Sequence, residues 1–392
     1  MKKIVLFIAS LQKGGSERVM ANLAADLKTK GYDVVLVTQY LGIHEYELAS
    51  GIRRVLSEPS EEELTQNRIR NFCKRFQRLR SVFKEENPDV VLAFLGKNNL
   101  MAILTTRFLP CKVAVSVRGE PTMEYPSKMM QILAKFLFHL ADGVIFQTSD
   151  ASGFFPKAVR KKSRILPNPL NEQFLQMVVE EDDMDTHRNK VTILDKVEDT
   201  KERGRISAFK ESDKHPFLVI TAGRLDENKN QELLLRAFAQ VKERKLPARL
   251  LLYGDGPLKN ELQMLAESLG IASDVTFAGS VSDLPIRMRQ ADLFVLPSNT
   301  EGMPNALLEA MATGLAVIST DCPCGGPREL IQNEKNGLLV PVKDVTAMAD
   351  AISRVLQDDT LRENLARNAK QSAGQYAPEL VNALWEEFLN SL

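Results

Sequence analysis

Two glutamates stand at positions 301 and 309 of the segment PSNTEGMPNALLEAM, which spans residues 297–311. The pattern predicts a strand, a loop and then a helix with Pro304 in its first turn, where proline is tolerated. Backbone N–H groups of residues 303–306 would then face an anion such as phosphate. Ionised carboxylates are strong hydrogen-bond acceptors, so Glu301 and Glu309 together indicate recognition of hydroxyl groups. For either glutamate alone, helix capping or a salt bridge is the ordinary explanation.

A second charged loop, GRLDENKN at residues 223–230, follows another apolar run. Arg224 and Lys229 can approach one anion from opposite sides of this loop. The forked donors of arginine and the compact charge of lysine together suit a diphosphate. Taken by itself, the loop is more commonly explained as a set of solvated surface charges.

Two glycine turns complete the candidate site. Gly14 and Gly15 precede a predicted helix, so the backbone can approach an anion closely there. The segment is not GxGxxG, and the dinucleotide-binding fingerprint is therefore absent. Gly254, in YGDGP, ends a further strand and would shape the same pocket. Each turn alone is explained just as well by local structure.

Short apolar runs and helical patterns alternate along the chain and would position these loops. Strands are predicted at residues 4–9, 33–38, 89–94, 112–117, 143–148, 217–222, 248–253, 275–278, 293–297 and 316–320. Helices are predicted at residues 17–30, 231–242 and 258–269. Such alternation is typical of an α/β fold with parallel sheets covered on both faces. The candidate loops follow the carboxyl ends of strands, where open α/β sheets bind ligands.

The strand series restarts at Phe217, which predicts two doubly wound parallel-sheet domains in tandem. We assign residues 1–170 to the first domain and residues 215–378 to the second. Residues 171–214 are charged and poor in continuous apolar sequence, so we interpret them as a linker with an insertion. A last amphipathic helix is predicted at residues 379–392, with Leu380, Leu384 and Phe388 on its apolar face beside Trp385.

Composition argues against a disordered protein, a membrane-spanning protein and a secreted disulfide-rich protein. The 392 residues are 44% hydrophobic and 26% charged, which is ordinary for a globular protein. No apolar run approaches the roughly 20 residues that cross a bilayer, and MKKIVLFIAS is too short a run for a signal peptide. The four cysteines fit neither a disulfide framework nor a paired zinc motif, which favours a reducing, cytoplasmic compartment.

Charge is divided unevenly along the chain. Residues 1–169 contain 26 Lys and Arg against 16 Asp and Glu, whereas residues 170–392 contain 25 against 35. The basic half would suit phosphate or an anionic membrane surface. Drift in surface composition explains the difference equally well.

Taken together, these motifs resemble the retaining glycosyltransferases of family 4, also called glycosyl transferases group 1. The matching segments occur in the family order and are GGSERV, GRLDENKN, YGDGP, FAGS before Asp283, SNTEGMPNALLEAMATGLAVIST and NGLLVP. The resemblance covers nearly the whole chain. It implies the GT-B fold, in which two Rossmann-like domains face each other across a cleft.

The resemblance also implies roles for individual residues. Arg224 and Lys229 would hold the diphosphate of a nucleotide-sugar donor, with UDP as the expected nucleotide. Glu309 would bind the ribose hydroxyls and Glu301 the hydroxyls of the transferred sugar. The remaining donor-site positions would be backbone or glycine positions, namely Met303, Pro304, Asn305, Ala306, Gly223 and Gly254.

Other positions would complete the cleft from the first domain. Gly14 and Gly15 would lie near the donor phosphate and the acceptor. Asn168, in LPNPL, matches an asparagine that follows the last strand of the first domain, and the helix at 379–392 would cross back onto that domain. Many relatives carry a histidine near residues 116–118, where this chain has SVRGEP. We therefore predict that Arg118 meets the sugar or an acceptor phosphate.

The expected chemistry is transfer of a sugar with retention of configuration, which follows from the resemblance alone. The departing diphosphate gathers negative charge, and stabilising that charge is the largest catalytic contribution expected. No DxD-like loop stands in the right place, so we expect no metal and no other cofactor.

Relatives often extend glycans on polyprenyl-diphosphate carriers, so the expected acceptor is a glycan or a lipid-linked glycan of surface polysaccharide synthesis, and no nucleic acid is expected. The segment RIRNFCKRFQRLRSVFK, residues 68–84, has apolar residues at helical spacing and seven interleaved basic residues. It would contact an anionic membrane and place the enzyme peripherally on its inner face. The alternative is an ordinary helix packed on its own sheet.

Three other functions fit parts of the pattern. A UDP-sugar epimerase of the same fold would release an altered nucleotide sugar without an acceptor. A non-catalytic sugar-nucleotide binding protein would bind the donor without turnover. The presence of both Glu301 and Glu309 with Arg224 and Lys229 argues against this alternative. A dinucleotide-dependent oxidoreductase lacks its glycine fingerprint here.

Overall fold

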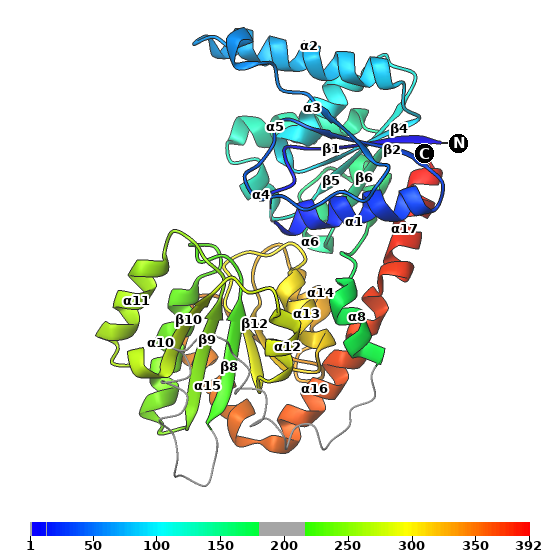
Figure 1. Ribbon diagram of the computed structural model, residues 1–392. Helices are drawn as coiled ribbons and strands as arrows, with labels where there is room; N and C mark the ends of the chain where they lie inside the picture. Colours follow the sequence, from blue (N-terminus) through cyan, green and yellow to red (C-terminus); the bar gives the residue numbers. More distant parts are fainter. Residues whose placement is uncertain (1, 13, 180–215) are drawn as a thin grey trace.

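The computed structural model describes residues 2–12, 14–179 and 216–392, and these fold into two α/β domains that meet at loops (Figure 1). The first domain contains a seven-stranded sheet and the second a six-stranded sheet, and all strand pairs in both are parallel. Within these residues, no helix is long and apolar enough to cross a membrane. This architecture confirms the predicted fold class.

The first sheet has the strand order β3-β2-β1-β4-β5-β6-β7. Its strands are β1 (Lys3–Ile8), β2 (Asp33–Thr38), β3 (Arg53–Leu56), β4 (Val90–Phe94), β5 (Lys112–Val117), β6 (Gly143–Phe146) and β7 (Ser163–Ile165). Successive residues of a strand point to opposite faces, and both faces here are apolar because helices cover both. Val5 and Phe7 pack toward one cluster of buried side chains, and Leu6 and Ile8 pack toward another.

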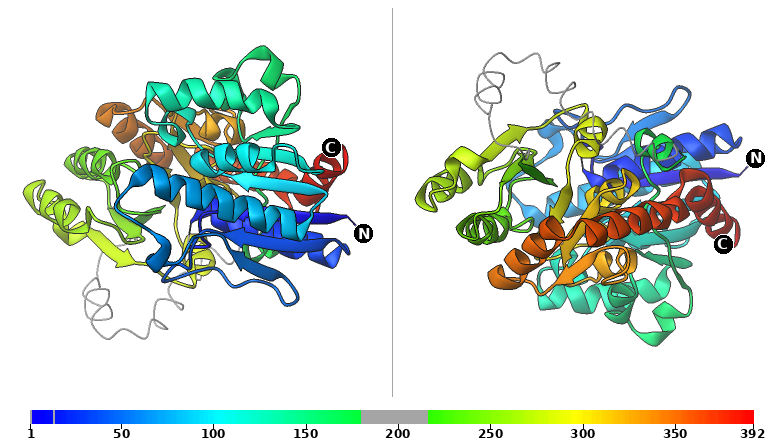
Figure 2. Two further views of the ribbon diagram at one scale, coloured as in Figure 1. Left: turned by 90° about the horizontal axis from the view of Figure 1, so that it is seen from above. Right: turned by 90° about the horizontal axis from the view of Figure 1, so that it is seen from below.

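Different helices cover the two faces of this sheet. One face packs against α2 (Arg68–Glu86), α3 (Gly96–Thr106) and α5 (Lys128–Leu137), and the other packs against α1 (Gly15–Thr29) and α17 (Pro378–Asn390). Figure 2 shows α2 on the outer side of the domain when the molecule is seen from above. The shorter helices of this domain are α4 (Pro121–Glu124), α6 (Ser149–Gly153) and α7 (Lys157–Arg160).

The second sheet has the order β10-β9-β8-β11-β12-β13. Its strands are β8 (Phe217–Ala222), β9 (Ala248–Tyr253), β10 (Val275–Gly279), β11 (Leu293–Leu296), β12 (Ala316–Thr320) and β13 (Leu338–Val340). One face packs against α10 (Gln231–Glu243), α11 (Lys259–Ser268) and α15 (Val345–Gln357). The other packs against α12 (Leu284–Arg289), α13 (Asn305–Ala312) and α16 (Asp359–Ala373), and α14 (Gly326–Leu330) follows β12.

The chain passes between the domains on two segments. The first includes α8 (Glu172–Val179), whose Phe174 is buried in the core of the second domain. The region that we predicted as linker therefore begins with a helix, whereas most of the predicted insertion lies outside the described residues. The second segment connects α16 to α17. Helix α17 lies beside the N-terminal strand (Figure 2).

The apolar face of α17 differs from the predicted one. Leu380 and Leu384 are exposed, whereas Val381, Trp385, Phe388 and Leu389 are buried on the first sheet. The indole ring of Trp385 lies 5.6 Å from the ring of Phe94 at the end of β4. Val381 and Trp385 therefore fill the core positions that we predicted for Leu380 and Leu384, each one residue later in the chain.

Candidate active site

The segment between β11 and α13 carries the two glutamates. Helix α13 begins at Asn305 with Pro304 as its N-cap residue, and no side chain caps it. Pro304 therefore lies one position before the helical turn in which we expected it. An uncapped helix start leaves backbone N–H groups available to a ligand and carries partial positive charge.

Glu301 lies in the loop before α13 and is buried beside a cation. Its Oε1 atom lies 2.5 Å from Lys229 Nζ and accepts a hydrogen bond of 2.6 Å from Ser298 Oγ. Burial acts to lower the pKa of Lys229, but Glu301 together with Asp226 and Cys322 outweighs this, so the pKa lies above its ordinary value. Lys229 and Glu301 therefore form a largely buried ion pair.

The loop after β8 holds Lys229 in this position. Asp226 Oδ1 accepts hydrogen bonds from the backbone N–H groups of Asn228 and Lys229. The side chain of Asn228 then joins this loop to Thr300, donating to its carbonyl at 3.0 Å and accepting from its hydroxyl at 2.7 Å. Arg224 stands apart from the ion pair: its side chain is 71% exposed, and Nε lies 3.7 Å from Asp226 Oδ2.

Two glycines allow the loops after β8 and β9 to approach closely. Gly254 has φ +122°, and a Cβ atom there would overlap the carbonyl group of Gly223. Gly254 N–H donates to the carbonyl of Gly279 at 2.8 Å, and Gly223 N–H donates to that of Tyr253 at 2.9 Å. Gly223 and Gly254 therefore position the loop that carries Arg224.

Glu309 lies inside α13 and pairs with the first domain. Arg18 Nη2, from the first turn of α1, lies 2.5 Å from Glu309 Oε1. Burial raises the pKa of Glu309 above its ordinary value, although Arg18 acts in the opposite direction. Gly15 lies against the start of the same helix, because a Cβ atom there would overlap the side-chain amide of Asn305. The glycine turn after β1 therefore meets the start of α13 across the two domains.

Asn168 links the first domain to the same helix start. Its Nδ2 donates to the Met303 carbonyl at 3.2 Å and to Asn305 Oδ1 at 2.7 Å, and its Oδ1 accepts a hydrogen bond from Arg118. Gln147 also contacts Asn168, at 2.7 Å. Asn168 is thus buried at the junction of the two domains.

Arg118 is buried rather than open to the space between the domains. Its guanidinium carbon lies 4.6 Å from the ring of Phe94 and 5.5 Å from that of Trp385. Burial lowers the pKa of Arg118 to about 9, against the opposing effect of Glu124 and Glu17. Its Nε atom is buried and makes no hydrogen bond to the described residues. The structure therefore connects Arg118 to the donor-side loops through Asn168.

Three residues with clear contacts had no role in the sequence interpretation. Arg18 and Ser298 touch the two glutamates, and Glu124 is a buried carboxylate that accepts hydrogen bonds from the backbone N–H groups of Gly96, Arg118 and Gly119. Arg18 stands inside the quoted motif GGSERV, so its place after the glycine turn was a usable signal. The contact of Ser298 with Glu301 and the three backbone bonds of Glu124 depend on tertiary structure.

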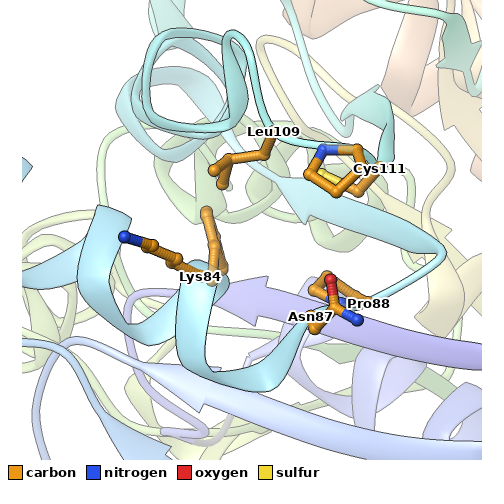
Figure 3. Close-up of a pocket in the computed structure, with 7 residues that line it drawn as sticks. Lys84, Asn87, Pro88, Leu109 and Cys111 are labelled. Atoms are coloured by element: carbon orange, nitrogen blue, oxygen red, sulfur yellow. The ribbon is translucent and has the colours of Figure 1, made fainter.

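A separate small pocket lies at the other end of the first sheet. It is lined by Phe83, Lys84, Asn87, Pro88, Leu109, Pro110 and Cys111, at the amino ends of β4 and β5 (Figure 3). The candidate loops follow carboxyl ends, so this pocket is not part of the site. Over residues 2–12, 14–179 and 216–392, no group of three or more His, Cys, Asp and Glu side chains is placed to hold a metal ion.

Comparison with known families gives one match for each half of the chain. Residues 13–174 match the model described as Glycosyltransferase Family 4, and residues 202–372 match that described as Glycosyl transferases group 1. The first match contains Gly14, Gly15, Arg118 and Asn168, and the second contains the loops with Arg224, Lys229 and both glutamates.

Relatives of similar length match over nearly the whole chain. A Campylobacter jejuni enzyme, a GalNAc-alpha-(1->4)-GalNAc-alpha-(1->3)-diNAcBac-PP-undecaprenol alpha-1,4-N-acetyl-D-galactosaminyltransferase, is 27% identical over 98% of this chain and 97% of its own. The amylovoran biosynthesis glycosyltransferase AmsD of Erwinia amylovora is 24% identical over the full length of both. Among solved structures, Anabaena HepE in complex with UDP-glucose has a TM-score of 0.79 at 19% identity over the full length of both chains.

Proposed function

Because the chain belongs to the family 4 and group 1 glycosyltransferases with the GT-B fold, we propose that it transfers a sugar from a UDP-sugar to a glycan or lipid-linked glycan acceptor. The observation that carries the donor assignment is the uncapped start of α13, flanked by Glu301, Glu309 and Lys229. The names of relatives support the acceptor class, since the C. jejuni enzyme acts on an undecaprenyl diphosphate-linked glycan. HepE supports UDP as the nucleotide.

In this proposal, Arg224, Lys229 and the N–H groups at the start of α13 stabilise the departing diphosphate. The bond between the sugar C1 and the phosphate oxygen breaks, and a bond from the acceptor oxygen to C1 forms on the same face. The proton of the acceptor hydroxyl passes to the departing phosphate oxygen. Glu301 orients sugar hydroxyls and Glu309 the ribose, so the protein supplies charge and position and no metal.

The test is a transfer assay with UDP-sugars and a soluble analogue of a diphosphate-linked glycan, in buffer with EDTA. We expect turnover with EDTA present and an α-linked product from an α-configured donor, read by NMR. An inverted product would refute retention, and loss of turnover in EDTA would refute metal independence. A reaction without acceptor that changes the nucleotide sugar would instead indicate an epimerase.

We also propose that the first domain contacts an anionic membrane at the cytoplasmic face, where a lipid-linked acceptor would be available. The basic helix α2 is exposed at Arg68, Arg70 and Arg78, although its Leu79, Val82 and Phe83 are buried on the sheet. Helix α5, on the same face of the sheet, adds an exposed apolar stripe of Met129, Ile132, Leu133 and Phe136, with Lys128 and Lys135 and no acidic residue. An apolar stripe flanked by lysines suits an anionic leaflet.

A further inference from the structure

One ion pair between the domains involves a glutamate of the proposed donor site. Arg18 of α1 and Glu309 of α13 are 2.5 Å apart, and their side chains are only 20% and 6% exposed. Helix α1 packs on the first sheet and α13 on the second. The pair therefore joins the domains at the carboxylate that we assign to the ribose.

The burial of Glu309 restricts what else can reach it. A carboxylate that binds ribose hydroxyls must offer oxygen atoms to a ligand, but this one is nearly inaccessible and already in contact with a guanidinium. Gly15, three residues before Arg18, also lies against the Asn305 side chain at the start of α13. Arg18 thus contacts Glu309 directly, while the glycine turn lies against the first residue of the same helix.

We infer that Arg18 gates the donor site: it holds Glu309 in the donor-free enzyme, and the ribose must displace it. This inference rests on the proposed function, in which Glu309 binds the ribose. A buried carboxylate left without a partner is unfavourable, and Arg18 supplies the opposite charge until the ligand arrives. Arg18 is accordingly a positioning residue, acting on the donor through Glu309.

A gate of this kind raises the apparent Kd of the donor, because only the molecules with an open gate can bind it. The apparent Kd equals the intrinsic Kd divided by the open fraction. If the paired form makes up about 80–90% of donor-free enzyme, the apparent Kd exceeds the intrinsic one by roughly five- to tenfold. Removal of the guanidinium should restore the intrinsic affinity. A residue that merely supported the fold would not strengthen binding when removed.

The experiment measures UDP binding by isothermal titration calorimetry with the full chain at pH 8. Arg18→Gln should lower the Kd of UDP roughly five- to tenfold, and Arg18→Lys, which keeps the charge, should stay closer to wild type. Arg328→Gln is the matched control. It removes another arginine at the domain interface, 3.1 Å from Asp150, that touches neither glutamate, and it should not tighten binding.

The outcomes separate the inference from the function on which it rests. An unchanged or weaker Kd for Arg18→Gln, in a variant whose circular dichroism and melting match wild type, would overturn the gate. A weaker Kd would further mean that Arg18 is itself a ligand contact. Absence of UDP binding by the wild-type chain would instead count against the proposed donor, as would unchanged binding in Glu309→Gln.

Discussion

Lys229 and Glu301 form one of the two buried ion pairs of the site. Lys229→Ala should reduce kcat of sugar transfer about 100-fold, because loss of one well-placed charged contact costs roughly 3 kcal/mol of transition-state stabilisation. Steady-state kinetics with a UDP-sugar provide the measurement. Arg236→Ala is the control, since Arg236 forms an exposed pair with Glu232 at 2.8 Å. A kcat within threefold of wild type would remove Lys229 from the mechanism.

Glu124 should make stability depend on pH. Burial raises the pKa of this carboxyl to about 7, against the effect of three backbone N–H donors. An acid whose pKa is higher in the folded state binds protons more tightly there, so its contribution is present at low pH and declines as pH rises toward 7. The free energy of unfolding, relative to Glu124→Gln, should fall by about 3 kcal/mol from pH 4.5 to pH 8. Denaturation at several pH values would show this, and a flat difference would contradict it.

Residue types alone identified most charged members of the site but not their partners. Glu301, Glu309 and Lys229 stand out by spacing and loop position. Their pairing is a different matter, since Lys229–Glu301 joins residues 72 positions apart and Arg18–Glu309 joins residues 291 positions apart. Arg118 could be flagged as a departure, but its place beside both Phe94 and Trp385 depends on how α17 returns to the first domain.

At the scale of elements, the strands with longer apolar runs could be predicted from the sequence, whereas the shortest edge strands could not. Each predicted strand overlaps a strand of the structure, because both faces of a parallel sheet demand continuous apolar sequence. Strands β3 (Arg53–Leu56), β7 (Ser163–Ile165) and β13 (Leu338–Val340) were missed, since each lies at a sheet edge and is only three or four residues long. The presence of helix α17 could be predicted from the sequence. Which of its faces is buried could not, because this depends on how the helix packs against the first sheet.

Helix α5 should control attachment to lipid. Ile132→Asp combined with Phe136→Asp should reduce co-flotation with phosphatidylglycerol vesicles roughly tenfold or more, because charged groups replace two exposed apolar anchors. Met264→Asp, at an exposed methionine of α11, is the matched control and should float like wild type. Transfer to a soluble acceptor should persist in the double variant. Flotation of the double variant at the wild-type level would exclude this helix as the contact.

At the scale of the whole molecule, α17 ties the end of the chain to the first domain. Trp385 is only 1% exposed, and Trp385→Ala should cost about 3–5 kcal/mol by leaving a cavity next to Phe94 and Arg118. Calorimetry should show the melting transition of the first domain lowered by roughly 10 °C. Leu384→Ala, at the exposed neighbouring position, should shift it by little. Equal melting of both variants would show that the helix contributes little to that core.

The same return of α17 brings residues 2 and 389 into one domain, where Lys2 Nζ donates to the Leu389 carbonyl at 2.6 Å (Figure 1). Two fluorophores, one on each of these segments, would move together with the first domain. Energy transfer between them would therefore not change when the two domains move relative to each other. One dye near residue 389 and another on α11, in the opposite domain, would report such motion directly. The way the chain doubles back thus dictates where optical probes must be attached.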